Sequence, residues 1–147
     1  MILFFSETKF LFRPKKPVKN WLIQVAKKEN MTVGNINIVF YNDEQLLKYN
    51  KQYLNHNTLT DIITFDYSEE KRLHGDIFIS IERVEENAQK FNYDFEEELR
   101  RVMVHGILHL CGYKDKTNAD KILMKQKEEE SLILFNTQFN YYKNKQL

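Results

Sequence analysis

The chain has 147 residues, the usual size of one domain, and we expect residues 1–147 to form a single domain whose tail frays over 140–147. A hydrophobic share of 42% excludes a disordered chain, and a net charge of +1 excludes binding to nucleic acid through overall charge. The single cysteine excludes an internal disulfide framework, and no apolar run approaches the ~20 residues that span a bilayer. We therefore expect a cytoplasmic protein with no membrane partner.

The first half of the chain predicts strands and helices in alternation. A short apolar run predicts a strand over residues 2–5, and a helix is expected after Pro14 and Pro17, with Gly34 ending that segment. The apolar stripe of this helix consists of Val18, Trp21, Leu22 and Val25. Alternating apolar residues predict a second strand over 36–40, and Asn42 or Asp43 can cap the short helix that follows.

The second half predicts two more strands and three more helices. Residues 62–65 and 77–81 are rich in β-branched side chains, and a helical pattern follows over 82–91. Asp94 predicts the N-cap of the next helix, because acidic residues fill its first turn, and Gly112 predicts its end. A last amphipathic helix is expected from about residue 118 to Phe135. These elements predict an α+β fold, a small mixed β-sheet packed with helices.

A histidine pair near the end of the penultimate predicted helix carries the chemistry. His105 and His109 are four residues apart, so on a helix they lie about 40° apart on one face and one turn apart along the axis. Just past Gly112, a glycine turn can bring the Asp115 carboxylate back to the same ion. Three protein ligands with one open position are typical of catalytic zinc. We predict one Zn²⁺ per chain, bound on this central helix and the loop after it.

This segment has two other interpretations. The histidines could be a packed pair, but the surrounding residues are too apolar to accommodate two unpaired imidazoles, since buried polar groups need partners. Cys111 lies about 200° around the helix from His109, which directs it away from the ion. We expect Cys111 to be a small core residue rather than a ligand.

The segment from His105 to Asp115 resembles the signature H-G-x-L-H-L-x-G-Y-D-H of the YbeY family, and His105, Gly106, Leu108, His109, Leu110, Gly112 and Tyr113 match it. Upstream, residues 49–53 resemble the family's L-N-x-x-Y-R segment, and residues 59–65 resemble its P-T-N/D-V-L-S-F segment. Residues 75–80 resemble its G-D-I strand. The ordered matches extend over about residues 38–115.

The resemblance implies a metal-dependent, single-strand-specific endoribonuclease that acts in 16S rRNA 3′-end maturation and ribosome biogenesis. Its substrate would be a ribosomal RNA precursor, and its partners a ribosomal subunit or assembly factors. A metal-bound water would be the nucleophile, since zinc makes bound water more acidic and polarises a phosphoryl oxygen. No general base is identified from the sequence: His56 and His74 are candidates by residue type alone, and Asp76 is expected to be a strand-end cap.

Two residues depart from the family pattern. Lys114-Asp115 replaces the usual final Asp-His, so the third ligand is a carboxylate, whose oxygen zinc also accepts. Leu54 stands where the family has an arginine, a natural candidate for holding phosphate. Without this arginine, other residues of the chain must hold the phosphate.

The RNA-binding residues are predicted beside the metal ligands, and each has a second interpretation. Lys114 and Lys116 can bind phosphate, or they can form an ordinary solvated face. Tyr113 can stack a single-stranded base, or it can pack under the loop.

Two alternative functions stay open. One is a ribosome-assembly or RNA-binding factor with a non-catalytic metal site. The other is a metalloprotease, because the ligand spacing is similar to that of metzincins, but Gly106 stands where they carry their catalytic glutamate.

Overall fold

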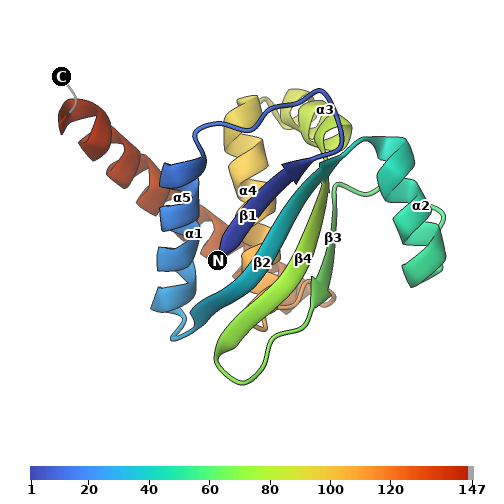
Figure 1. Ribbon diagram of the computed structural model, residues 1–147, viewed down its shortest axis with the longest axis horizontal. Helices are drawn as coiled ribbons and strands as arrows, with labels where there is room; N and C mark the ends of the chain where they lie inside the picture. The colour runs from blue at the N-terminus through green and yellow to red at the C-terminus, as the bar shows by residue number, and fades with distance from the viewer. Residues whose placement is uncertain (146–147) are drawn as a thin grey trace.

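The computed structural model describes the backbone of residues 1–145 and the side chains of residues 1–139. In this part of the chain a single mixed sheet has the strand order β1-β2-β4-β3 (Figure 1). Its strands are β1 (Ile2–Ser6), β2 (Thr32–Tyr41), β3 (Ile62–Asp66) and β4 (Arg72–Ser80). β2 pairs in parallel with both β1 and β4, whereas β3 is antiparallel to β4 and forms an edge.

The helices within residues 1–145 are α1 (Lys15–Lys28), α2 (Asp43–Leu54), α3 (Ile81–Phe91), α4 (Phe95–Leu110) and α5 (Asn118–Lys145). α1 and α4 cover one face of the sheet, α2 covers part of the other, and α5 packs against α1 and α4 (Figure 1). The predicted α+β class with a small mixed sheet is confirmed.

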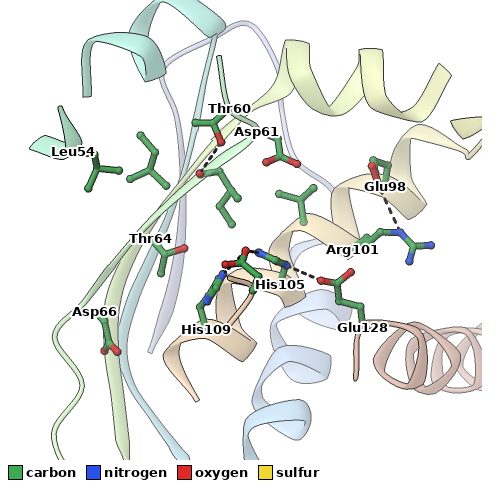
Figure 2. Close-up of a pocket in the computed structure, with 14 residues that line it drawn as sticks. Leu54, Thr60, Asp61, Thr64, Asp66, Glu98, Arg101, His105, His109 and Glu128 are labelled. Carbon is green, nitrogen blue, oxygen red and sulfur yellow. Dashed lines mark hydrogen bonds and ion pairs between the residues drawn. The ribbon is translucent and has the colours of Figure 1, made fainter. Parts of the chain in front are cut away.

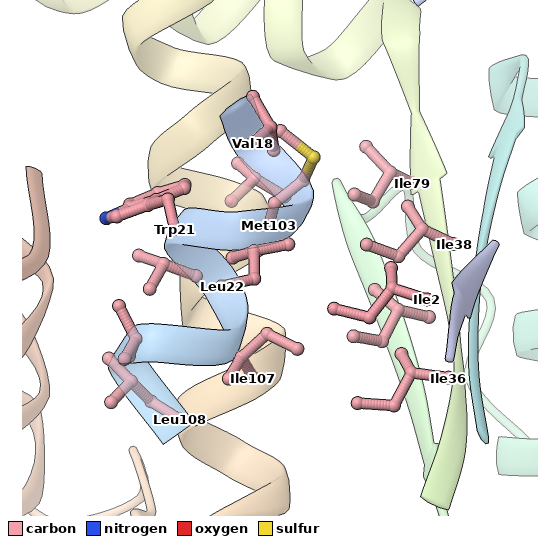
Figure 3. Close-up of a cluster of buried hydrophobic side chains, with 14 of the residues drawn as sticks. Ile2, Val18, Trp21, Leu22, Ile36, Ile38, Ile79, Met103, Ile107 and Leu108 are labelled. Carbon is pink, nitrogen blue, oxygen red and sulfur yellow. The ribbon is translucent and has the colours of Figure 1, made fainter. Parts of the chain in front are cut away.

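The main hydrophobic core fills the space between the sheet and the helices α1 and α4. Alternate residues of the central strands point into it, as the period of two requires, and meet the apolar stripes of the two helices (Figure 3). The fully buried side chains include Ile2, Ile36, Ile38, Ile79, Trp21, Leu22, Met103 and Ile107. Each buried side chain of this size contributes about 1.5–3 kcal/mol. α4 is therefore fixed against the sheet along its length.

Local sequence signals begin several of the helices. Asn42 forms a capping box with Gln45: the Asn42 side chain accepts from the Gln45 amide at 2.8 Å, and the Gln45 side chain accepts from the Asn42 amide at 3.0 Å. Ser80 caps α3 by accepting from the Arg83 amide at 3.2 Å. Asp94 occupies the predicted N-cap of α4 without a side-chain hydrogen bond, and the acidic first turn follows it.

Several predicted boundaries and positions are wrong. Gly34 does not end the first helix, which stops at Lys28; it lies in β2, where a Cβ would come within 2.2 Å of the His74 ring. Ile81 begins α3 instead of ending β4, because Ser80 caps the helix there. Asp76 is not a strand-end cap, since it lies within β4 and accepts from the Asn37 side chain at 3.0 Å.

The end of the chain is more helical than predicted. α5 continues to Lys145, past the expected end at Phe135. Residues 146–147 lie outside the described residues, and fraying of the tail stays a prediction. None of the helices in residues 1–145 combines the length and apolar character that crossing a membrane requires.

Candidate metal centre

Helix α4 presents its two histidines on the side opposite its most buried residues. Met103 and Ile107 point into the core, whereas His105 and His109 are half-buried and face a cavity. Gly106 allows this close packing, because a Cβ there would lie 2.9 Å from Ile77 Cδ1 on β4. The helix backbone therefore lies close to the sheet, and the histidine positions are fixed by the core.

The three predicted metal ligands converge in the structure (Figure 2). His105 Nε2 lies 3.4 Å and His109 Nε2 lies 3.3 Å from the same oxygen, Asp115 Oδ2. One ligand atom from each of the three residues lies within 4.8 Å of the other two. Gly112, with φ of 105°, makes the turn after α4 that returns the chain to the histidines. The structure therefore brings the three residues together, and metal binding by them stays a prediction.

The other nitrogen of each imidazole has its own partner. His109 Nδ1 lies 2.9 Å from the Tyr113 carbonyl oxygen, which can only accept, so this nitrogen carries the proton. His105 Nδ1 lies 2.6 Å from Glu128 Oε2 on α5 and donates to that carboxylate. In the neutral histidines, both Nε2 atoms therefore carry no proton, and both lie near Asp115 Oδ2. This is the arrangement that orients histidine ligands in metal sites.

The environment of His105 is electrostatically favourable for positive charge. Burial lowers the pKa of His105, but the hydrogen bond to Glu128 and the carboxylates of Asp115 and Asp61 outweigh it, and the pKa is raised above its usual value. The carboxylates that stabilise the positive charge of a protonated His105 would also stabilise a metal cation bound at its Nε2 atom. The carboxylates around the histidines therefore favour a metal ion.

The histidines open into a cavity of about 580 Å³ between α4 and β3 (Figure 2). Its ionisable lining residues are Asp61, Asp66, Glu98, Arg101, His105, His109, Asp115 and Glu128. Burial raises the pKa of Asp61, although the positive charge of His105 opposes the shift. Burial also raises the pKa of Glu98 to about 7, against the opposing charge of Arg101. The cavity is therefore acidic, with a single guanidinium in its lining.

Sequence reasoning missed four carboxylates of this cavity, those of Asp61, Asp66, Glu98 and Glu128. Glu98 lies two turns before His105 on the same helix face, and this spacing was available as a signal. Asp61 precedes β3, Asp66 ends it and Glu128 lies on α5, and none of these positions is adjacent to the histidines in the chain. Only the folded arrangement brings them together.

The predicted RNA-binding residues lie outside the cavity lining. Lys114 and Lys116 are exposed on the loop after α4. The Tyr113 hydroxyl donates to Glu29 Oε2 at 2.7 Å, and the ring packs half-buried against the core, 5.8 Å beneath the Lys127 amine. In this arrangement Tyr113 joins the loop to α1, and its ring is partly covered.

Of the other residues that the sequence singles out, Leu54 lines the cavity and His56, His74 and Cys111 do not. Leu54 lines the cavity on the side across from the histidines. His56 and His74 do not line it, and the His74 ring accepts from the Asn35 amide at 3.0 Å. Cys111 packs half-buried against the core, and burial raises the pKa of its thiol to about 12. Its surroundings fit the predicted packing role.

Comparisons with known proteins match most of the chain to one family. The family model described as "Endoribonuclease YbeY" matches residues 6–136. "Endoribonuclease YbeY" of Flavobacterium psychrophilum is 54% identical over 140 residues, covering 95% of this chain and 100% of the relative. The protein of the same description from Flavobacterium johnsoniae is 51% identical, with 94% and 99% coverage.

A solved structure supports the same assignment. A solution structure of a Thermotoga maritima protein matches with a TM-score of 0.69 and 30% identity, covering 97% of this chain and 93% of that one. The matched range includes β3 and α4, which line the cavity, and all three converging residues. The chain therefore belongs to the YbeY family of endoribonucleases.

Proposed function

We propose that this single-domain protein cleaves single-stranded RNA with the help of one zinc ion, held by His105, His109 and Asp115. We propose further that it acts in the cytoplasm on a ribosomal RNA precursor, in 16S rRNA 3′-end maturation during ribosome biogenesis. A ribosomal subunit or assembly factors would be its partners. The family supports the activity and the RNA substrate, and the geometry of the three side chains supports the metal.

The observation that carries the proposal is the position of Asp115 Oδ2 between the two Nε2 atoms. Ligand atoms about 2.0–2.2 Å from one tetrahedral zinc ion lie about 3.3–3.6 Å apart. The two separations from Asp115 Oδ2, 3.4 Å and 3.3 Å, fall in this range, and the three ligand atoms all lie within 4.8 Å of one another. The two imidazoles and the carboxylate are also donor types that zinc accepts. These residues fit the ion.

The chain's own residues orient the site for phosphodiester hydrolysis. Glu128 and the Tyr113 carbonyl hold the histidine Nδ1 protons, so that both Nε2 atoms face the cavity. When bound, the ion would lower the pKa of a water molecule and polarise a phosphoryl oxygen. The cavity provides space for an RNA segment beside the three ligands.

A direct test combines metal analysis with cleavage of a single-stranded RNA. The wild-type protein should contain about one zinc per chain and lose cleavage on chelation, and His109→Ala should lose both the zinc and the cleavage. His74→Ala is the matched control, because it removes a histidine outside the cavity. Equal zinc content in wild type and His109→Ala would exclude the site, and cleavage that survives chelation would exclude the chemistry.

A second candidate function is a ribosome-assembly or RNA-binding factor with a non-catalytic metal site. The observation that favours it is Leu54, an apolar residue in the cavity where the family has an arginine. RNA binding by the zinc-loaded protein without any cleavage would support this function. A peptidase is disfavoured, because Gly106 provides no carboxylate beside His105. A peptide library, assayed with and without chelator, tests it.

A further inference from the structure

The C-terminal end of α2 forms a part of the cavity rim that the proposed chemistry does not use. Leu54 lines the cavity on the side across from the histidines (Figure 2). The preceding residue, Tyr53, is 55% exposed although it is aromatic. Because Tyr53 directly precedes Leu54 at the end of α2, its ring is within reach of an RNA strand that leaves the cavity over Leu54.

The Tyr53 ring is held in place by other aromatic rings. It lies 5.2 Å from the ring of Tyr49 at 33° and contacts the ring of Phe65 edge-on at 5.8 Å. Tyr49 in turn stacks on Phe78 of β4 at 4.7 Å. These contacts orient Tyr53 before any ligand arrives, which lowers the entropy lost on binding. More than half of the side chain is still open to solvent.

The charges of the cavity disfavour recognition through phosphates alone. Five carboxylates line it against the single guanidinium of Arg101, and that group is already paired with Glu98 and Glu129. The family arginine is replaced by Leu54. Stacking of a base on an aromatic ring needs no positive charge, and it contributes about 1–3 kcal/mol per base. In this acidic region, stacking of a base on an aromatic side chain can therefore contribute affinity for RNA that phosphate contacts do not.

We propose that Tyr53 is a base-stacking subsite for the RNA strand whose phosphodiester lies at the metal centre. This inference rests on the proposed function, since it assumes an RNA substrate. A single strand can present an unstacked base to the ring, whereas the bases of a duplex are stacked on one another. The subsite thus selects single strands, and it tolerates any base because each has a π-face.

Steady-state kinetics test the subsite in the zinc-loaded protein. With a single-stranded RNA, Tyr53→Ala should raise KM by about tenfold or more and leave kcat within about twofold. Tyr53→Phe and Tyr53→Trp should keep the wild-type KM, because each retains a ring. Phe91→Ala is the matched control: Phe91 is 56% exposed and lies outside the cavity lining. An unchanged KM in Tyr53→Ala would overturn the proposal.

Abasic substrates separate stacking from a general loss of structure. One base at a time is removed from an oligouridine, and KM is measured for wild type and Tyr53→Ala. At one position near the cleaved bond, base removal should raise KM in wild type and have no further effect in Tyr53→Ala. Equal effects in both proteins at every position would overturn the proposal.

A binding assay keeps this result separate from the proposed catalysis. Fluorescence anisotropy compares His109→Ala with the double variant His109→Ala/Tyr53→Ala on a labelled single strand, so no cleavage is needed. The double variant should bind about tenfold more weakly. Equal affinities would reject the subsite even if the wild-type protein cleaves RNA. A loss of affinity in a protein whose wild type does not cleave would reject the proposed catalysis and retain the subsite.

Discussion

The two faces of the sheet are packed in different ways. The face under α1 and α4 is closed: side chains such as Ile36, Ile38 and Ile77 have no exposed surface, and the rings of Trp21 and Phe40 are buried with them. The face under α2 is aromatic and only partly covered: Leu46, Ile63 and Phe78 are buried there, while several rings around them are half-buried or exposed. Close packing fixes the first face, and the second keeps open surface.

This difference corresponds to a difference in role. The closed face supports α4, so the histidines gain their positions from a core that does not involve the metal. The open face includes the Tyr53 ring, which contacts Phe65, and the next residue, Leu54, lines the same cavity. The closed face, which supports the metal ligands, and the open face, which is accessible to a substrate, thus meet at the edge strand β3. The following predictions test this contrast.

The largest effect is expected from the core residues of the closed face. Ile38→Ala should lower the free energy of unfolding by about 2–5 kcal/mol, because Ile38 is fully buried between the sheet and the helices. Its neighbour Val39 points to the other face and is half-buried, so Val39→Ala should cost only about 1 kcal/mol. Urea unfolding at one pH measures both. Equal losses would show that the two faces are equally packed.

The buried carboxyl of Glu98 should make stability depend on pH. Burial raises its pKa from 4.5 to about 7, so between these values the folded protein keeps a proton that the unfolded chain has released. The stability that Glu98 contributes is therefore fully present below about pH 4.5 and is lost as pH rises through about 7.

The variant Glu98→Gln isolates this contribution. Between pH 4.5 and 8, wild type should lose up to about 3 kcal/mol that the variant does not lose. Urea unfolding in the presence of chelator, at both pH values, measures the difference for each protein. A parallel pH dependence in wild type and variant would show that Glu98 keeps an ordinary pKa.

Metal removal should have a smaller effect on the fold than core substitution. α4 is held by the core, so the apo protein should stay folded with its histidines in place. Zinc at about 100 times its Kd adds about 2.7 kcal/mol, and its removal should lower Tm by less than about 10 °C. Differential scanning calorimetry with and without chelator measures this shift. Unfolding of the apo protein would show that the metal is structural.

The smallest effect is expected from the exposed lysines of the loop after α4. Lys114→Ala and Lys116→Ala should each weaken RNA binding slightly and reduce the salt dependence of log K by about 0.7 per lost phosphate contact. Binding measured over a series of salt concentrations tests this, with Lys48→Ala on the exposed side of α2 as a control. An unchanged slope would remove both lysines from the RNA contact.

The sequence alone determined the elements and the centre of the candidate site. The strands around residues 36–40 and 62–65 and the helices begun by Asn42 and Asp94 follow from local alternation and capping, which act over a few residues. The spacing of His105 and His109 places them on one helix face by helical geometry alone. Asp115 follows the turn at Gly112 and is only six residues after His109, so a local pattern could predict it as well.

Only the tertiary structure decided what surrounds those residues. Glu128 forms a hydrogen bond with His105, 23 residues earlier in the chain, and Tyr113 forms one with Glu29, 84 residues earlier. No local sequence pattern predicts such pairs. Gly34 does not end a helix for the same reason: a glycine is required there because the ring of His74 on the neighbouring strand occupies the place of a Cβ. The closed and open faces, the acidic cavity and the exposed Tyr53 ring arise from packing between distant segments. Local periodicity specifies which face of an element is apolar, and the assembled fold decides which partner covers that face.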